Sequence, residues 1–146
     1  MTKQRQAVAG VLYDAGGHLS AEDVFRLAKE RLPSISRATV YNNLHAMEEE
    51  KSIRRITVDG ADLYDRAYAP HPHLICDRCG RVEDLPLPWL DDRLTEVLGE
   101  RPTSYEFKIG YICPSCHKKE QKKNNNLHLF KEKQKWNSKE PKPKRI

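Results

Sequence analysis

Two pairs of cysteines, each with two residues between its members, most strongly constrain how this chain of 146 residues can fold. They are Cys76 with Cys79 and Cys113 with Cys116, and they contain all 4 cysteines of the sequence. Four thiolates in two such pairs are typical of a closed tetrahedral zinc site, which stabilises a fold and leaves no position open for catalysis. Disulfides, which a reducing cytosol disfavours, and a redox-active dithiol are the alternatives. The sequence therefore predicts structural Zn²⁺.

The first 66 residues have the pattern of three helices followed by a β-hairpin. Apolar residues recur every three or four positions, and Gly16, Ser20 and Pro33 stand where helices begin or end. Asp59-Gly60 is a strong signal for a two-residue hairpin turn. The order is that of a winged helix-turn-helix, here expected over residues 1–66. We expect helices from about residue 8 to 15, at 20–32 and at 37–50, and strands at 53–58 and 61–65.

The third expected helix carries the residues best placed to read DNA. Tyr41 and Asn42 lie on the face opposite Val40 and Leu44, and asparagine can pair with adenine while a tyrosine ring packs on a thymine methyl. Alternatively, Tyr41 packs beside the core and Asn42 is merely solvated. The charge of residues 1–66, with 10 basic and 10 acidic side chains, argues mildly against DNA. The candidate phosphate contacts are Arg5, Arg37, Arg54 and Arg55.

Residues 67–117 predict a small α/β unit around the cysteines. Leu90, Leu94 and Leu98 stand at helical spacing, and apolar residues alternate with polar ones over 104–112, as in a half-buried strand. Shorter strands are expected at 73–76 and 81–85. A unit of about 50 residues buries too little surface to be stable alone, so zinc and dimerisation should stabilise it. The predicted fold class is α+β, with a winged helix-turn-helix followed by this dimerisation domain.

Histidines and aspartates around the junction of the two halves form a second candidate metal-binding group. Imidazole and carboxylate ligands suit manganese, iron or zinc better than a metal that prefers thiolates. Taken singly, each of these side chains is more often just solvated. The group consists of His18, Asp65, His71, His73 and Asp84.

The net charge of +5 is concentrated in the C-terminal tail. Residues 118–146 contain 11 Lys or Arg against 3 Glu, a net of +8, which leaves −3 for residues 1–117. Few apolar residues predict a basic, disordered tail, with at most a short helix around 127–135 and non-specific attraction to phosphate backbones. The sequence has no stretch of about 20 apolar residues and no signal peptide, so a cytoplasmic protein is expected.

Three motifs together resemble the ferric uptake regulator (Fur) family over about residues 2–117. They are Ala-Thr-Val-Tyr-Asn-Asn-Leu at 38–44, the helix start at 18–23, and His-x-His-x-x-Cys-x-x-Cys-Gly at 71–80. The resemblance implies a homodimeric winged-helix repressor in which a hinge metal controls binding to double-stranded operator DNA. Tyr-Asn-Asn and Asp84 are similar to the peroxide-sensing PerR branch, because iron-sensing members usually have Glu at that last position.

The resemblance also implies roles for particular residues. It maps the regulatory Fe²⁺ or Mn²⁺ ligands onto the five histidines and aspartates given above. It further implies that Fe²⁺ there reacts with peroxide and that His18 and His71 are oxidised. A further regulatory site of some members has its ligands where Pro70, Pro72 and Tyr105 stand here, so we expect that site to be absent. The chain also begins directly at the motif Thr2-x-Gln4-Arg5, without the extra turn or helix that most members have.

Other classes of function stay open at this point. One is an iron-, manganese- or zinc-responsive regulator of the same family without peroxide sensing. Another is a zinc-ribbon interaction module that does not bind DNA, although a wing after a helix-turn-helix argues against it. An enzyme would need an open metal position or an accessible dithiol, and a closed site of four cysteines supplies neither. We therefore expect no catalysis, no small organic substrate and no membrane partner.

Overall fold

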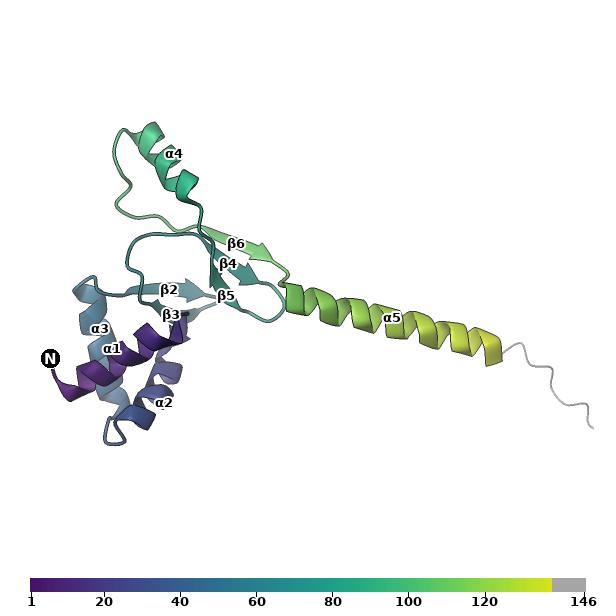
Figure 1. Ribbon diagram of the computed structural model, residues 1–146, viewed down its shortest axis with the longest axis horizontal. Coiled ribbons are helices and arrows are strands. Elements are labelled where there is room, and N and C mark those ends of the chain that lie inside the picture. Colours follow the sequence, from purple (N-terminus) through teal and green to yellow (C-terminus); the bar gives the residue numbers. More distant parts are fainter. Residues whose placement is uncertain (138–146) are drawn as a thin grey trace, which may run out of the picture. The chain divides into compact units, whose positions relative to one another are not determined.

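The computed structural model describes residues 1–137, which fall into two compact units. The main unit consists of residues 1–74 and 82–109, and the cysteine unit consists of residues 75–81 and the chain from 110 onward. The fold class is α+β, as predicted, with helices and two small sheets (Figure 1). Within the described residues, no helix is both long enough and apolar enough to cross a membrane.

Three helices with well-defined N-termini build the core of the main unit. They are α1 (Lys3–Ala15), α2 (Ala21–Arg31) and α3 (Arg37–Glu49). The hydroxyls of Thr2, Ser20 and Ser36 each accept a hydrogen bond from the backbone N–H three residues further on, which satisfies a donor that the helix leaves free. The helices pack against one another through a continuous apolar core (Figure 1). Its fully buried members include Val8, Leu12, Val24, Val40 and Leu44.

A three-stranded sheet follows the helices and contains the predicted hairpin. Strands β2 (Arg54–Val58) and β3 (Ala61–Asp65) pair antiparallel, with Val58 opposite Ala61. Asp59 and Gly60 both have positive φ, 50° and 77°, as a tight primed turn requires. The sequence did not predict β1 (Leu19–Ser20), which pairs with the other side of β3 and gives the order β1-β3-β2.

The second sheet has the order β5-β4-β6. Its strands are β4 (His73–Cys76), β5 (Val82–Asp84) and β6 (Lys108–Tyr111). The strand expected over 104–112 is therefore shorter. A physical reason lies at Tyr105, whose carbonyl accepts a hydrogen bond from Arg54 Nη2 at 2.7 Å rather than from a neighbouring strand.

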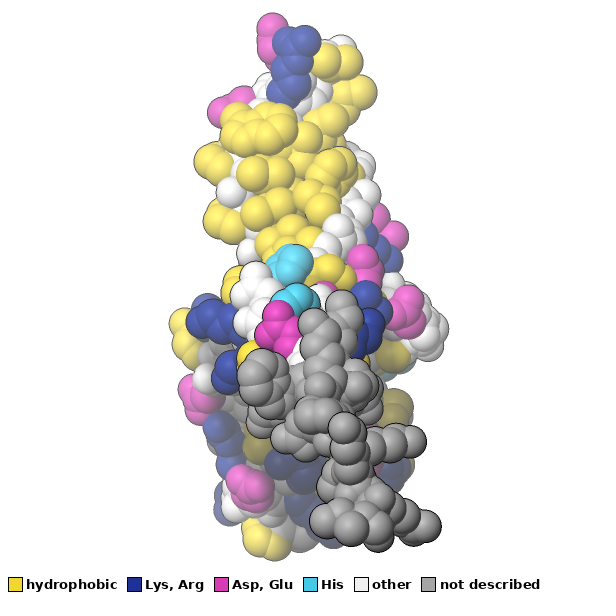
Figure 2. All heavy atoms as spheres, turned by 90° about the vertical axis from the view of Figure 1, so that its right-hand side faces the viewer, with side chains coloured by type: hydrophobic (Ala, Val, Ile, Leu, Met, Phe, Trp, Pro, Cys, Tyr) yellow, Lys and Arg dark blue, Asp and Glu magenta, His cyan; other side chains and the backbone are white. Residues whose placement is uncertain are grey.

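Helix α4 (Pro88–Leu98) differs from the other helices of the main unit because none of its residues is buried. Trp89, Val97 and Leu98 are 61%, 70% and 58% exposed, so these three side chains face solvent, while Leu90 and Leu94 are partly buried. Figure 2 shows the broad hydrophobic patch that results over this helix. An apolar surface of this kind is typical of an interface with another protein chain.

Helix α5 (Pro114–Asn137) replaces most of the disordered tail that the composition predicts. Pro114 lies in its first turn, where a missing N–H costs nothing, and the lysine, glutamate and glutamine that follow favour helices. Arg78 Nε forms an ion pair with Glu120 Oε1 at 2.8 Å, which holds the first half of the helix to the turn between the first two cysteines. Residues 138–146 of the expected tail lie outside the described part of the chain.

The N-cap hydrogen bond of α3 should contribute measurably to the stability of the fold. Ser36→Ala removes the acceptor for the Thr39 N–H, 3.2 Å away, and should lower the free energy of unfolding by about 1 kcal/mol. Urea unfolding followed by circular dichroism measures the change. Ser34→Ala, in the exposed turn just before the cap, is the matched control and should change stability by less than about 0.5 kcal/mol. Equal losses in both variants would contradict the capping role.

Candidate metal centres

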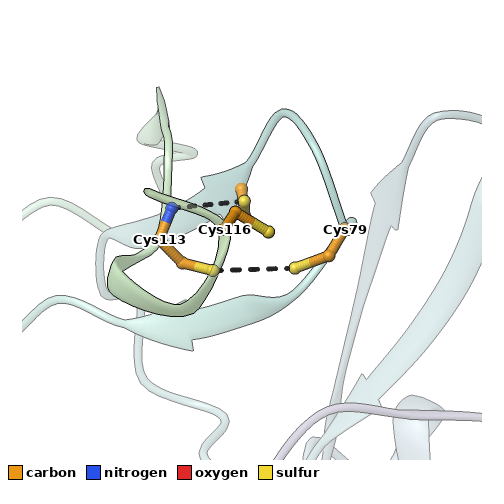
Figure 3. A group of neighbouring side chains, drawn as sticks. Cys79, Cys113 and Cys116 are labelled. Carbon is orange, nitrogen blue, oxygen red and sulfur yellow. Dashed lines mark hydrogen bonds between the residues drawn. The ribbon is translucent and has the colours of Figure 1, made fainter. Parts of the chain in front are cut away.

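The four cysteines gather in the cysteine unit. Their sulfur atoms all lie within 4.8 Å of one another, and none of them is in a disulfide. Cys79 Sγ lies 3.8 Å from Cys113 Sγ. Figure 3 shows these two sulfur atoms pointing toward each other. Four sulfurs about 2.3 Å from a zinc ion in tetrahedral geometry would be about 3.8 Å apart, so the observed separation fits a zinc-sized cation. Only Cys79 is exposed.

Backbone N–H groups hold the two cysteine pairs in this position. Gly80 has a φ of 73°, and its N–H donates to the Cys76 carbonyl to close the first turn. The Cys113 N–H donates to Cys76 Sγ at 3.3 Å and joins the second pair to the first (Figure 3). This bond is the main cause that lowers the pKa of Cys76 to about 6. Hydrogen bonding with Cys113, together with burial, raises the pKa of Cys116 to about 12, so this thiol ionises only if a cation compensates its charge.

The predicted group of histidines and aspartates gathers in the main unit. One ligand atom from each of its five members lies within 4.8 Å of all the others. Asp65 Oδ2 lies 3.0 Å from His71 Nε2, 3.3 Å from His18 Nε2 and 3.8 Å from His73 Nε2. Asp84 Oδ1 lies 2.9, 3.2 and 3.5 Å from the same three nitrogens in the same order. Two carboxylates therefore converge on the same three imidazole nitrogens.

The two sheets explain why residues so far apart in sequence meet. Because Leu19 pairs with Tyr64, His18 comes to lie beside Asp65 at the end of β3. His73 begins β4 and Asp84 ends β5, the neighbouring strand. His71 Nδ1 is hydrogen-bonded to the Ala69 carbonyl at 2.8 Å, which favours the tautomer with Nδ1 protonated and leaves Nε2 as the ligand atom.

Several polar atoms of this group are buried without a hydrogen-bond partner. They are His18 Nδ1 and Nε2, His73 Nε2 and Asp65 Oδ2. A buried polar atom left unpaired is costly, and proteins rarely tolerate several at one point. A divalent cation between these atoms would satisfy all of them except His18 Nδ1. The set of three imidazoles and two carboxylates therefore fits a metal such as iron, manganese or zinc.

Without a metal, protons on the imidazoles must supply the positive charge that balances the carboxylates of this group. Burial raises the pKa of Asp65, but the three imidazoles and the Ala67 N–H outweigh it, and the net pKa lies well below its usual range. The contact with Asp65 raises the pKa of His71 to about 9, against the opposing effect of burial. At neutral pH the metal-free group therefore holds an ionised aspartate beside a protonated histidine.

The candidate DNA contacts differ in exposure. Tyr41 and Asn42 are both exposed on α3, the former at 47%. Arg37 and Arg5 lie at the N-termini of α3 and α1, where their side chains remain partly or fully accessible. Arg54 is half-buried and donates to the Tyr105 carbonyl, which directs it away from solvent. Its neighbour Arg55, the other candidate at the base of the hairpin, is exposed.

Comparison with known proteins finds relatives of one family over most of the chain. Residues 1–109 match the sequence model described as the ferric uptake regulator family. The peroxide operon regulator of Bacillus subtilis is 32% identical over 124 residues, which cover 82% of this chain and 86% of that protein. The ferric uptake regulation protein of the same organism is 37% identical over 131 residues, covering 82% and 87%. The solved ferric uptake regulator of Helicobacter pylori superposes with a TM-score of 0.69 at 29% identity, covering 80% and 81%.

The raised pKa of His71 predicts how metal binding depends on pH. Because this pKa is about 9 in the metal-free group, a metal must displace the proton at neutral pH. The apparent affinity for Mn²⁺ should rise up to about tenfold per pH unit between pH 6.5 and 8.5 and level off above pH 9. Calorimetric titration in buffers of different ionisation enthalpy measures both the affinity and the proton released. An affinity independent of pH over this range would contradict the assignment.

Proposed function

Since the chain belongs to the ferric uptake regulator family, we propose that it is a metal-dependent transcriptional repressor that binds operator DNA as a homodimer. We further propose that it senses peroxide through iron bound by His18, Asp65, His71, His73 and Asp84, with Mn²⁺ as the alternative regulatory metal. Cys76, Cys79, Cys113 and Cys116 hold structural Zn²⁺. The protein acts in the cytoplasm, without a catalytic role, a membrane partner or a small organic substrate.

The five-residue group is the observation that carries this proposal. His18, just before β1, and Asp65, at the end of β3, belong to the winged helix, whereas His71, His73 and Asp84 follow it in the chain. A ligand that all five residues bind fixes the orientation of the first two relative to the other three. In a dimer, two α3 helices must reach successive major grooves, about 34 Å apart, so this orientation decides whether both can bind at once. Metal binding therefore favours the arrangement that binds DNA.

The exposed surfaces support the two partners. Helix α3 presents Tyr41 and Asn42 to solvent near its N-terminal end, where a recognition helix contacts base edges. The apolar side chains of Trp89, Val97 and Leu98 in α4, which are largely exposed within the described residues, supply a surface for a second copy of the chain. Zinc in the cysteine unit adds the stability that so small a unit lacks.

Peroxide sensing rests on the ligand set and on one relative. Position 84 carries Asp, and the peroxide operon regulator of Bacillus subtilis is among the similar proteins. Iron held by these five residues would supply the redox chemistry by which peroxide adds one oxygen atom to an imidazole of His18 or His71 and is itself reduced to water. Both histidines are members of the five-residue group. The His71 side chain is 20% exposed and that of His18 only 4%, so His71 is the more accessible to solvent. An oxidised imidazole is a weaker ligand, so the orientation of the winged helix is lost and DNA is released.

A regulator that responds to iron, manganese or zinc without sensing peroxide is the second candidate. The ferric uptake regulation protein of Bacillus subtilis is more identical to this chain, at 37%, than the peroxide regulator, at 32%. The two functions need the same ligands and differ only in what bound iron does. The peroxide experiment below decides between them.

Asn42 tests the assignment of base recognition. Asn42→Ala should weaken binding to a duplex selected from a random pool by the Mn²⁺-loaded wild-type protein by about 1–3 kcal/mol, because a bidentate contact to one base is lost. Binding to random duplex should change little. Arg37→Ala is the comparison variant and should weaken both duplexes alike, since phosphate contacts carry no sequence information. Fluorescence anisotropy measures all four affinities, and equal losses on both duplexes for Asn42→Ala would remove this residue from readout.

Peroxide sensing is tested by peptide mass spectrometry of iron-loaded protein after mild peroxide treatment, alongside DNA binding. We expect one added oxygen on His18 or His71, in proportion to the loss of DNA binding. In protein loaded with Mn²⁺, the histidines should stay unmodified and DNA should stay bound, because Mn²⁺ does not reduce peroxide as Fe²⁺ does. Unmodified histidines together with unchanged DNA binding would favour the second candidate. Oxidation confined to the four cysteines would place the sensor in the cysteine unit.

A further inference from the structure

Three arginines of the winged helix, Arg5, Arg37 and Arg55, already have anionic partners within the same domain. Arg5 Nη1 and Nη2 donate to the two carboxylate oxygens of Glu50 at 3.1 and 2.5 Å. Arg37 Nη1 donates to Glu22 Oε2. Arg55 donates to Glu48 and Asp62 at 3.1 and 3.3 Å. These three guanidinium groups are therefore occupied by carboxylates.

The tertiary fold, rather than local sequence, brings the first two pairs together. Arg5 lies in the first turn of α1, whereas Glu50 is the C-cap residue of α3, 45 positions away. Arg37 begins α3 and Glu22 lies in the first turn of α2, 15 positions earlier. Both carboxylates remain accessible, with 56% and 57% of the Glu50 and Glu22 side chains exposed. Exposed ion pairs contribute little to stability, so folding alone does not explain both of them.

We propose that Glu22 and Glu50 compete with DNA phosphates for Arg37 and Arg5 and thereby keep the DNA affinity of a single winged helix low. The inference rests on the proposed DNA-binding function and deepens it. A DNA phosphate must displace the carboxylate from each arginine. The displaced carboxylate then takes up a cation from solution, which offsets the cation that the phosphate releases. Each contact therefore contributes less to DNA affinity through counterion release. The equal numbers of acidic and basic side chains in residues 1–66, 10 of each, leave no general attraction to compensate.

This competition makes DNA binding depend on the metal. When the affinity of one winged helix is low, stable binding needs both helices of a dimer to engage together, because the second contact is then effectively intramolecular. Only the orientation that the five-residue group fixes allows this. If Arg5 and Arg37 were free, each winged helix would hold DNA well enough to bind without the metal.

The double variant Glu22→Gln/Glu50→Gln tests the proposal, because glutamine keeps the shape and removes the charge. The matched control is Glu30→Gln/Glu100→Gln, which makes the same change of charge at two exposed glutamates for which residues 1–137 show no arginine partner. Fluorescence anisotropy on random duplex of 30 base pairs and on the selected duplex, over a range of salt and with or without added Mn²⁺, gives the affinities.

We expect the Glu22/Glu50 variant to bind both duplexes roughly tenfold more tightly than wild type at low salt, with a slope of log affinity against log salt steeper by up to about 0.9 per pair and per chain. It should also keep most of its binding without Mn²⁺. The control should show a smaller rise, the wild-type slope and full dependence on Mn²⁺. Equal behaviour of the two double variants, or no change in either, would overturn the proposal.

Two further measurements keep the outcomes distinct. The single variants Glu22→Gln and Glu50→Gln should each give about half of the change in slope, and circular dichroism shows whether every variant folds. If the wild-type protein prefers the selected duplex in the presence of Mn²⁺ but both double variants behave alike, only this inference fails. If neither wild type nor the Glu22/Glu50 variant binds any duplex, the proposed function fails together with it.

Discussion

The arrangement around Asp65 depends on positive charge. This carboxylate is 4% exposed and lies within 3.8 Å of three imidazole nitrogens, two of which are buried without a hydrogen-bond partner. An ionised group so far from water is stable only beside a compensating cation. A proton on His71 supplies one charge, and a divalent metal supplies two while satisfying more of the unpaired atoms. The pairing of β1 with β3 and the adjacent ends of β4 and β5 bring these side chains to one point.

The two metal centres differ in chemistry and in place. The cysteine site lies wholly in its own unit, and four thiolates around a tetrahedral zinc ion would leave no free ligand position. The histidine and aspartate site lies in the main unit, has only nitrogen and oxygen ligands, and includes the half-exposed Asp84. A tightly held ion suits stabilisation, whereas an exchangeable one suits a response to conditions.

Sequence reasoning predicted the three helices and the hairpin because helical periodicity and the Asp59-Gly60 turn are local signals. The five members of the second group were candidates from residue type and position, but only the resemblance assigned them to one site, since nothing local places His18 beside Asp65. That contact depends on β1, which is only two residues long and has no periodic pattern. The inward direction of Arg54 depends on the Tyr105 carbonyl, 51 positions away. Over residues 118–137 the structure has a helix where the composition predicts disorder. Good helix formers follow a proline at the helix start there, whereas the prediction relied on the lack of apolar residues.

The exposed apolar side chains of α4 make dimer formation, and therefore the proposed repression, depend on the protein concentration. These side chains favour association over solvation, as the exposed Trp89 and Val97 illustrate. In the proposed homodimer, the concentration of paired chains at low abundance rises with the square of the concentration of single chains, so halving the protein content of a cell would leave only a quarter of the pairs. Growth, proteolysis or slower synthesis would then relieve repression while metal and oxidant levels stay constant.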